Sequence, residues 1–211
     1  MKGVAAILAI TLVAAHPAAA EEWRNELTPA KPGHAAVWKP MTLHYRFGWG
    51  MVSAAEAMLK LSRPRTGIIK TTVEGHSTGW VRSLWRMDAK GFALADANTL
   101  HPIRLRQAEW YRNGTGLTAL EFTPADVRHA KGGVPKDPPA DFFAETPADD
   151  PALKALANAK PKHFVFPDLF DLSTALLFVR SLPLENGDVV RLVAYPQNSA
   201  YLATIKVTGR E

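Results

Sequence analysis

Residues 103–122 read IRLRQAEWYRNGTGLTALEF and carry the clearest β-hairpin signal of the chain. Asn113-Gly114 supplies the positive φ angles of a tight turn, and it separates two runs that favour extended structure. We therefore predict paired strands at Ile103 to Arg112 and Leu117 to Phe122. Asn113-Gly114-Thr115 also fits the glycosylation pattern, but the tight turn is the better interpretation of these residues.

Further strands are expected on both sides of this hairpin. Apolar and polar residues alternate at period two in Met41 to Gly48 and in Val52 to Leu61, although the second run is rich in helix-forming residues. Ile68 to Glu74 is rich in β-forming residues. Val189 to Tyr195 and Tyr201 to Val207 are predicted to form a second hairpin, with the other edge of the last strand exposed.

The best helix signal lies at Asp171 to Ser181. Asp171 is a suitable N-cap, and one apolar stripe is expected to face the core. Its members are Leu172, Leu176 and Val179. Arg180 shares this side, so we expect it either to extend to solvent at the helix end or to form a buried pair with a carboxylate.

A long proline-rich loop is expected at residues 131–161, because proline fits neither a strand ladder nor a helix interior. Short helices are predicted at Trp80 to Met87 and at Ala152 to Ala159. The whole pattern predicts an α+β fold that is mainly β, in which a twisted antiparallel sheet packs against one main helix.

The first twenty residues have the pattern of a secretory signal peptide. Lys2 precedes an apolar run from Val4 to Ala15, and small residues end the segment at Ala18-Ala19-Ala20. We expect cleavage before Glu21, an extended lead-in over residues 21–40, and a single mainly-β domain over residues 41–211. The expected compartment is the periplasm, and no transmembrane span is expected after cleavage.

Composition narrows the function further. The chain has no cysteine, which excludes disulfides, a thiolate site and a lipid anchor on cysteine. The formal net charge of +5 is too mild to predict a nucleic-acid partner. No pair of histidines has the short spacing of a metal site, and we expect neither a metal nor a cofactor.

Gly75-His76-Ser77-Thr78-Gly79 matches the G-x-S-x-G pattern of a serine nucleophile. The preceding strand is amphipathic rather than fully buried, and bulky Trp80 follows the second glycine, so the context differs from that of a hydrolase. If Ser77 were catalytic, His129 or His163 would be the candidate base. We expect instead that Ser77 is structural and that the chain has no catalytic residue.

Several segments together resemble an exported bacterial family called domain of unknown function 3108. They are Leu43 to Gly48, Ser83 to Trp85, Asp96 to Leu100, Asp171 to Arg180 and Gly187, and the similarity spans Met41 to Gly209. The resemblance implies a mostly antiparallel exported domain, by analogy with the curved half-barrels of periplasmic lipoprotein carriers. It implies no activity, and it leads us to expect further strands beyond Glu211.

Two classes of function follow. The leading hypothesis is a non-enzymatic periplasmic protein that binds an apolar or amphiphilic envelope component, or a partner protein, on the concave face of the sheet. The alternative is a serine esterase or other hydrolase that uses Ser77. The sequence identifies no individual ligand-binding residue, because aromatic residues in strands are common core residues.

Overall fold

The computed structural model contains two β-sheets, which belong to two different compact units. The residues that it describes are 6–14, 23–33, 39–49, 51–124, 126–134, 142–145, 151–164 and 168–210. Strands dominate both units and all but one pairing is antiparallel among the described strands, which confirms the predicted mainly-β, α+β class. That a single domain covers residues 41–211 stays a prediction.

The larger sheet has eight strands, each paired with its neighbours in chain order. They are β2 (Met41–Trp49), β3 (Val52–Arg65), β4 (Ile68–Ser77), β5 (Met87–Asp96), β6 (Pro102–Tyr111), β7 (Gly114–Phe122), β8 (Asp126–Gly132) and β9 (Lys162–His163). A short helix, α1 (Gly79–Leu84), connects β4 to β5. Such a meander places every second connection at the same end of the sheet.

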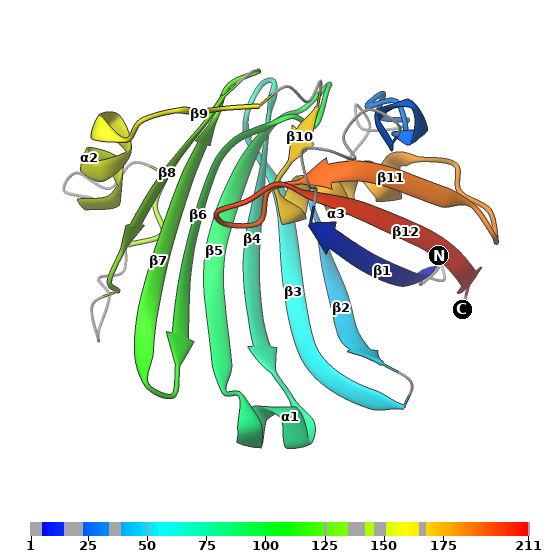
Figure 1. Ribbon diagram of the computed structural model, residues 1–211, viewed down its shortest axis with the longest axis horizontal. Helices are drawn as coiled ribbons and strands as arrows, with labels where there is room; N and C mark the ends of the chain where they lie inside the picture. Colours follow the sequence, from blue (N-terminus) through cyan, green and yellow to red (C-terminus); the bar gives the residue numbers. More distant parts are fainter. Residues whose placement is uncertain are drawn as a thin grey trace. The chain divides into compact units, whose positions relative to one another are not determined.

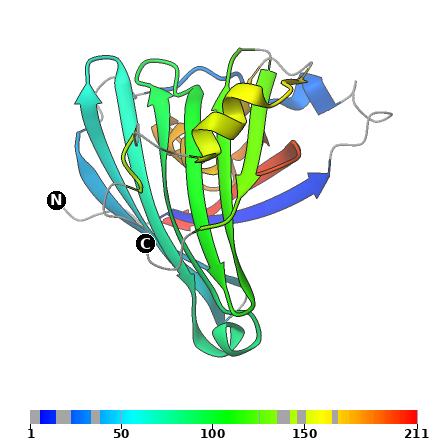
Figure 2. The ribbon, with the colours of Figure 1, turned by 90° about the vertical axis from the view of Figure 1, so that its left-hand side faces the viewer.

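This sheet is strongly curved, as Figures 1 and 2 show, so it has a concave face and an outer face. Directly paired residues point to the same side of a sheet. Met58 and its partner Glu74 share a row with Ala108 and Leu117, which pack with Leu156 of the helix at residues 151–158 on the outer face, so Leu59 and its partner Val73 lie on the concave face. This alternation confirms the period-two pattern on which the strands were predicted.

Helix α2 (Pro151–Asn158) covers part of the outer face beside β7 and β8 (Figure 2). A cluster of buried side chains lies there, with Trp110 and Phe143 packed against it. Its members are Ala108, Leu117, Ala119, Ala130, Val134, Phe142 and Leu156. The predicted short helix in the proline-rich segment is thus confirmed, and the described parts of that segment contribute apolar side chains to a core.

The second unit holds a four-stranded sheet in the order β1-β12-β11-β10. Its strands are β1 (Ala6–Ala14), β12 (Tyr201–Arg210), β11 (Val189–Ala194) and β10 (Leu169–Phe170). The predicted hairpin is confirmed, because β11 and β12 pair antiparallel from Val189 with Lys206 to Ala194 with Tyr201. The prediction that β12 has an exposed second edge is wrong, since β1 pairs along that edge.

Part of the lead-in also belongs to this unit. The short 3-10 helix η2 (Trp23–Glu26) precedes Thr28, whose backbone N–H donates to the carbonyl of Arg191 at 2.8 Å. The Thr28 hydroxyl accepts from the Arg191 N–H at 3.0 Å. The lead-in is thus extended beside β11 at this point, while the remainder of the predicted segment at residues 34–38 lies outside the described residues.

The predicted main helix is α3 (Leu172–Ser181), and it contacts β10 and β11 of the four-stranded sheet. Asp171 caps it as predicted, because its carboxylate accepts from the N–H groups of Ser173 and Thr174. The predicted stripe is wrong at Leu172, whose exposed fraction is 46%, and Leu176 is only half-buried.

The buried face of α3 is turned by about one residue from the predicted stripe. Leu177, Phe178 and Val179 are buried, and small Ser173, Thr174 and Ala175 share their side. The prediction considered only large apolar residues, so it did not include the small residues Ser173, Thr174 and Ala175 on the buried side. Arg180 is exposed, so the expected alternative of a buried pair is wrong.

Three strands of the large sheet were not predicted: β5, β8 and the two-residue β9, of which the first two are the longer. β5 carries Gly91 and many alanines, which have low strand propensity. β8 is short and polar, and its last residues overlap the start of the predicted loop. Both of these longer strands form because neighbouring strands pair with each of them on both edges. Tertiary pairing thus overrides weak local propensity here.

Candidate ligand-binding site

At the end of the sheet where β2 connects to β3, the concave face combines large aromatic side chains with very small residues. Tyr45 and Phe47 project from β2. The neighbouring strands place small residues in the same two rows. These are Ala55, Ala57, Gly75 and Ala89, and Ser77 and Met87 complete the row that contains Phe47 and Tyr111. We call this surface, together with Glu109 and Tyr111 of β6 in the same rows, the basin.

Alanine and glycine side chains extend less far above a sheet than larger side chains do. A Cβ atom added to Gly75 would lie 3.4 Å from the Cβ of Ala57, which is an ordinary van der Waals contact. The two residues therefore face the same side of the sheet, and neither has a side chain longer than a methyl group. Aromatic rings stand at the sides of the basin. Tyr45 and Phe47 stack with their ring centroids 6.2 Å apart, and Trp85 stacks on Tyr111 at 6.4 Å.

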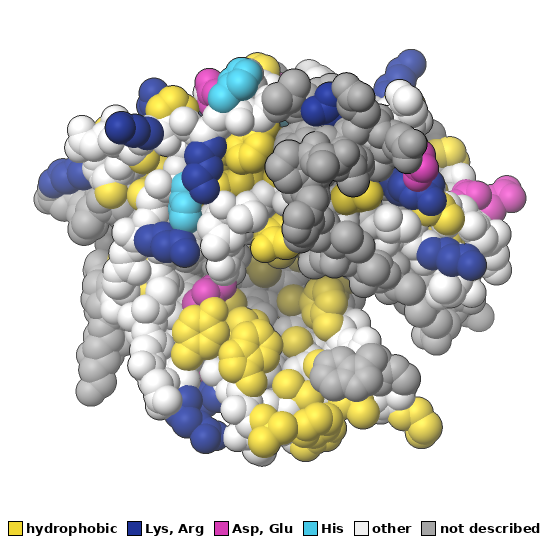
Figure 3. Space-filling view, viewed as in Figure 1, with side chains coloured by type: hydrophobic (Ala, Val, Ile, Leu, Met, Phe, Trp, Pro, Cys, Tyr) yellow, Lys and Arg dark blue, Asp and Glu magenta, His cyan; other side chains and the backbone are white. Residues whose placement is uncertain are grey.

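These aromatic side chains are substantially accessible. The exposed fractions are 39% for Phe47, 37% for Tyr111 and 53% for Trp85. Figure 3 shows hydrophobic side chains gathered over this end of the sheet. Exposed apolar surface of this kind costs free energy in water, and contiguous patches commonly mark binding sites.

One carboxylate lies among these apolar residues. Glu109 has an exposed fraction of only 8%, and its two oxygens accept from the Tyr111 hydroxyl at 2.5 Å and from the Gln107 amide at 2.6 Å. Desolvation and the bond to Glu109 raise the pKa of Tyr111 to about 12, which keeps its hydroxyl protonated and donating. The basin therefore contains one carboxylate, hydrogen-bonded to a tyrosine hydroxyl, within a mainly apolar surface.

Ser77 of the G-x-S-x-G motif is the last residue of β4 and is fully buried. Its hydroxyl accepts from the Met87 N–H at 3.0 Å and so joins β4 to the start of β5. Gly79 has a φ of +56°, which lets the chain turn into α1. Ser77 and Gly79, which suggested a nucleophile motif, thus both have structural roles at this strand-to-helix turn.

Neither candidate base lies beside Ser77. His129 shares a row with Leu120, and that row crosses β4 at Thr71, six residues from Ser77, or about 20 Å along the strand. His163 pairs with Asp126 through Nδ1 at 2.9 Å, far from β4 in strand order. Burial lowers the pKa of His129, helped by nearby Lys131 and Lys162. The structure thus does not assemble the predicted serine and histidine.

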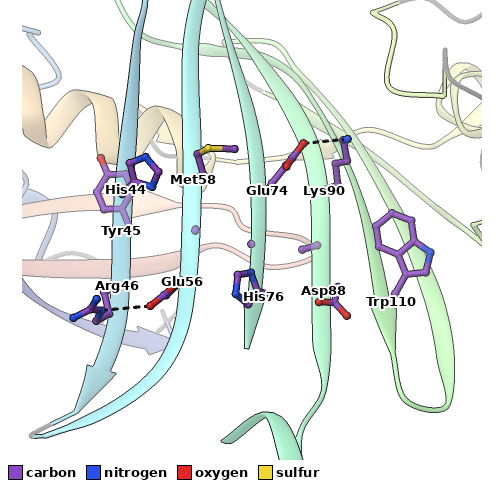
Figure 4. A pocket seen from close by; sticks show the side chains of 13 residues that line it. His44, Tyr45, Arg46, Glu56, Met58, Glu74, His76, Asp88, Lys90 and Trp110 are labelled. Carbon is purple, nitrogen blue, oxygen red and sulfur yellow. Dashed lines mark ion pairs between the residues drawn. The ribbon is translucent and has the colours of Figure 1, made fainter. Parts of the chain in front are cut away.

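A second hollow lies on the outer face, over β2 to β6 (Figure 4). Its volume is about 720 Å³, and two rows of outward side chains form its walls. One row contains His44, Met58, Glu74 and Lys90, and the other contains Arg46, Glu56, His76, Asp88 and Trp110. Tyr45, Ala57, Gly75 and Ala89, which lie between these two rows along their strands, also line the hollow, so its floor and the basin share four residues. We call this hollow the outer groove.

The charged side chains of the outer groove are engaged with one another or with neighbours. Glu74 pairs with Lys90 at 3.0 Å, and Arg46 pairs with Glu56 at 3.5 Å. The hydrogen bond from Arg82 holds the pKa of Asp88 below its ordinary value. Cross-strand ion pairs of this kind are ordinary for the solvated face of a sheet. The outer groove therefore offers a ligand less driving force than the basin does.

No group of three metal-ligating side chains occurs among the described residues. No helix in the described part of the chain has the length and apolar character needed to cross a membrane. One wall of the basin has a signal in the sequence, because Tyr45 and Phe47 belong to a clear alternating run. There is none for Trp85, Glu109 or the small residues, which the sheet register brings together from distant segments.

Comparison with known proteins identifies a family. The family described as "Protein of unknown function (DUF3108)" matches residues 42–211 of the chain. No curated protein and no solved structure matches it. The match covers more than half of the chain. It includes all eight strands of the larger sheet, and only Met41 at the start of β2 lies outside it. The chain belongs to the DUF3108 family of proteins of unknown function.

Proposed function

We propose that this is an exported, non-enzymatic protein that binds an apolar or amphiphilic component of the cell envelope in the basin. The observation that carries the proposal is the exposed aromatic surface at Phe47, Trp85 and Tyr111 over a floor of alanine and glycine. Ligand sites are typically concave, mostly apolar, and supplied with a few polar groups.

The chemistry of the basin favours an amphiphile over a purely polar ligand. An acyl chain can lie against the aromatic rings and remove their apolar surface from water, which is worth about 25 cal/mol per Å². The hydrogen-bonded pair of Glu109 and Tyr111 lies beside this apolar surface, so the polar part of an amphiphile can lie next to it while the acyl chain covers the rings.

The proposed compartment is the periplasm. Residues 1–20 have the charge, apolar run and small-residue end of a signal peptide, and signal peptidase would release the remaining chain. Cleavage would also remove β1 (Ala6–Ala14) from the edge of β12. An envelope amphiphile is the class of ligand that such a protein meets after export.

A fluorescent lysophospholipid tests the proposal by direct titration of the purified exported protein. Phe47→Ser removes a wall and Ala57→Phe fills the floor, so each variant should bind at least about tenfold more weakly, given the transfer energy of one aromatic side chain. His44→Ser and Met58→Phe are matched controls, because they lie on the same strands but face outward.

The proposal predicts that both controls bind like the wild type. Equal weakening by basin and control variants would place the ligand elsewhere, and the absence of any saturable binding would refute the proposal. Melting curves on all four variants separate lost binding from lost folding.

We further propose that Ser77 has no catalytic role. Its hydroxyl is buried and bonded to Met87, and no histidine lies in its row on the sheet among the described strands. A labelled fluorophosphonate should therefore leave Ser77 unmodified in the native protein. Labelling that disappears in Ser77→Ala would establish the hydrolase alternative instead.

A further inference from the structure

One end of the eight-stranded sheet carries an unusual surface. Three connections lie there: residues 50–51 between β2 and β3, residues 78–86 between β4 and β5, and residues 112–113 between β6 and β7. Six of the nine exposed large hydrophobic residues in the described chain lie at this end. They are Phe47, Met51, Trp80, Leu84, Trp85 and Tyr111.

The exposure is high and is concentrated on α1 and on the neighbouring turn. The exposed fractions are 104% for Met51, 74% for Leu84 and 55% for Trp80. We call Met51, Trp80, Leu84 and Trp85 the tip. Single exposed apolar residues are common, but a group of this size at one end of a sheet indicates an interaction surface.

The charged side chains at this end are mainly basic. The three connections contain Arg82, Arg86 and Arg112, and Asp88 of β5 pairs with Arg82 at 2.9 Å and with Arg86 at 3.5 Å. Three arginines and one aspartate leave a formal charge of +2 beside the apolar side chains. Arg112 donates to the Ser83 carbonyl at 2.7 Å and so ties the β6–β7 turn to α1. Thr78 at the start of the second connection donates through its N–H to the Ala54 carbonyl at 2.9 Å, which ties that connection to β3. The tip is thus a fixed surface built from several connections.

We propose that the tip docks on a membrane surface that carries anionic head groups. Tryptophan prefers the boundary between head groups and acyl chains, and leucine and methionine side chains partition just below it. Arginines beside such residues gain from the negative surface potential of an anionic leaflet. A bilayer with anionic head groups supplies an apolar layer and a negative charge at once, which matches apolar side chains beside a net positive charge.

This surface borders the basin, because Trp85 belongs to the tip and stacks on Tyr111 of the basin. Docking would bring the open aromatic side of the basin next to the lipid layer that contains amphiphiles. The inference does not depend on occupation of the basin, since the tip residues Met51, Trp80 and Leu84 are not basin residues.

Co-sedimentation with vesicles tests the inference on the purified exported protein. We compare vesicles of phosphatidylcholine alone with vesicles that contain phosphatidylglycerol as well. Binding to the anionic vesicles should be at least about tenfold tighter and should weaken as salt rises, because added ions screen the arginines. Equal binding to both compositions would refute the electrostatic part of the proposal.

The double variant Trp80→Ser and Leu84→Ser should lose at least about tenfold in affinity for anionic vesicles, since it removes the side chains that would be buried in lipid. Arg86→Gln should weaken binding only to the anionic vesicles. Ile103→Ser is the matched control, because Ile103 is exposed at 36% and lies near the opposite end of β6. Melting curves check that each variant is folded.

Three results would overturn the proposal. The first is no vesicle binding by the wild type, and the second is full binding by the double variant. The third is a wild type that self-associates but binds no vesicles, with a double variant that does not self-associate; this result would assign the tip to a second copy of the chain. The basin variant Phe47→Ser should retain vesicle binding while losing the lysophospholipid. The proposal for the docking surface and the proposal for the ligand site can therefore be refuted independently of each other.

Discussion

Replacing Asp171 by asparagine should stabilise the protein above pH 6 and leave it unchanged at low pH. Asp171 is fully buried, and its Oδ1 accepts from the Ser173 and Thr174 N–H groups at 2.7 and 3.1 Å. Its Oδ2 has no hydrogen-bond partner among the residues that the structure describes. Desolvation raises the pKa of this carboxyl from 3.8 to about 6, although the two backbone bonds oppose the rise.

The sign and size of the effect follow from this pKa. Because the folded-state pKa lies above the unfolded value, the contribution of Asp171 to stability is fully present below pH 3.8 and is lost as the pH rises to about 6. The loss amounts to about 3 kcal/mol at most. Asparagine keeps the capping oxygen and carries no charge, so Asp171→Asn avoids the loss.

Urea unfolding at pH 4, 5, 6 and 8 measures the difference between wild type and Asp171→Asn, and the other titrating groups cancel in that difference. We expect it to be near zero at pH 4 and to grow to about 1 to 3 kcal/mol in favour of asparagine at pH 8. Asp171→Ala, which loses the cap, should be less stable than Asp171→Asn throughout by about 1 kcal/mol. A difference that is constant with pH, or that favours aspartate at pH 8, would refute the reasoning.

Three further predictions concern the helix, the serine and the leader. Leu177→Ala should cost about 2 to 5 kcal/mol in urea melts, whereas Leu172→Ala should cost under about 1 kcal/mol, because only Leu177 is buried; equal costs would mean that α3 packs differently. Ser77→Ala should lower stability by about 1 to 3 kcal/mol, since it leaves the buried Met87 N–H without its acceptor, and an unchanged melting curve would contradict this structural role. Intact-mass analysis of the exported protein should give a chain that begins at Glu21, and a mass that retains Met1 to Ala20 would contradict the proposed export.

The sequence predicted the elements whose local signals agree with their surroundings. Met41 to Gly48 alternates cleanly and Asn113-Gly114 marks its turn, so β2 and the β6–β7 hairpin were found. Asp171 was recognised as a cap because an aspartate before an apolar run has few other local roles. In these cases short-range chemistry and tertiary structure favour the same conformation.

The missed features depend on contacts between distant segments. β5 contains three alanines and a glycine among its ten residues, which lowers its local strand propensity, and pairing with β4 and β6 makes it a strand. The basin arises from the register of several strands, which places Phe47 and Tyr111 over a floor of small residues. No periodicity within one segment encodes that register, so the sequence predicted a concave binding face and none of its residues.

The central claim is that an amphiphile occupies the basin on the concave face, and photo-crosslinking locates it directly. A lysophospholipid with a diazirine in its acyl chain is bound to the purified exported protein, irradiated, and mapped by peptide mass spectrometry. We predict labels on Phe47, Trp85 and Tyr111, which do not line the outer groove, and none on outward-facing His44 or Trp110, which do. Labels confined to the outer groove, or spread without preference over both faces, would contradict the claim.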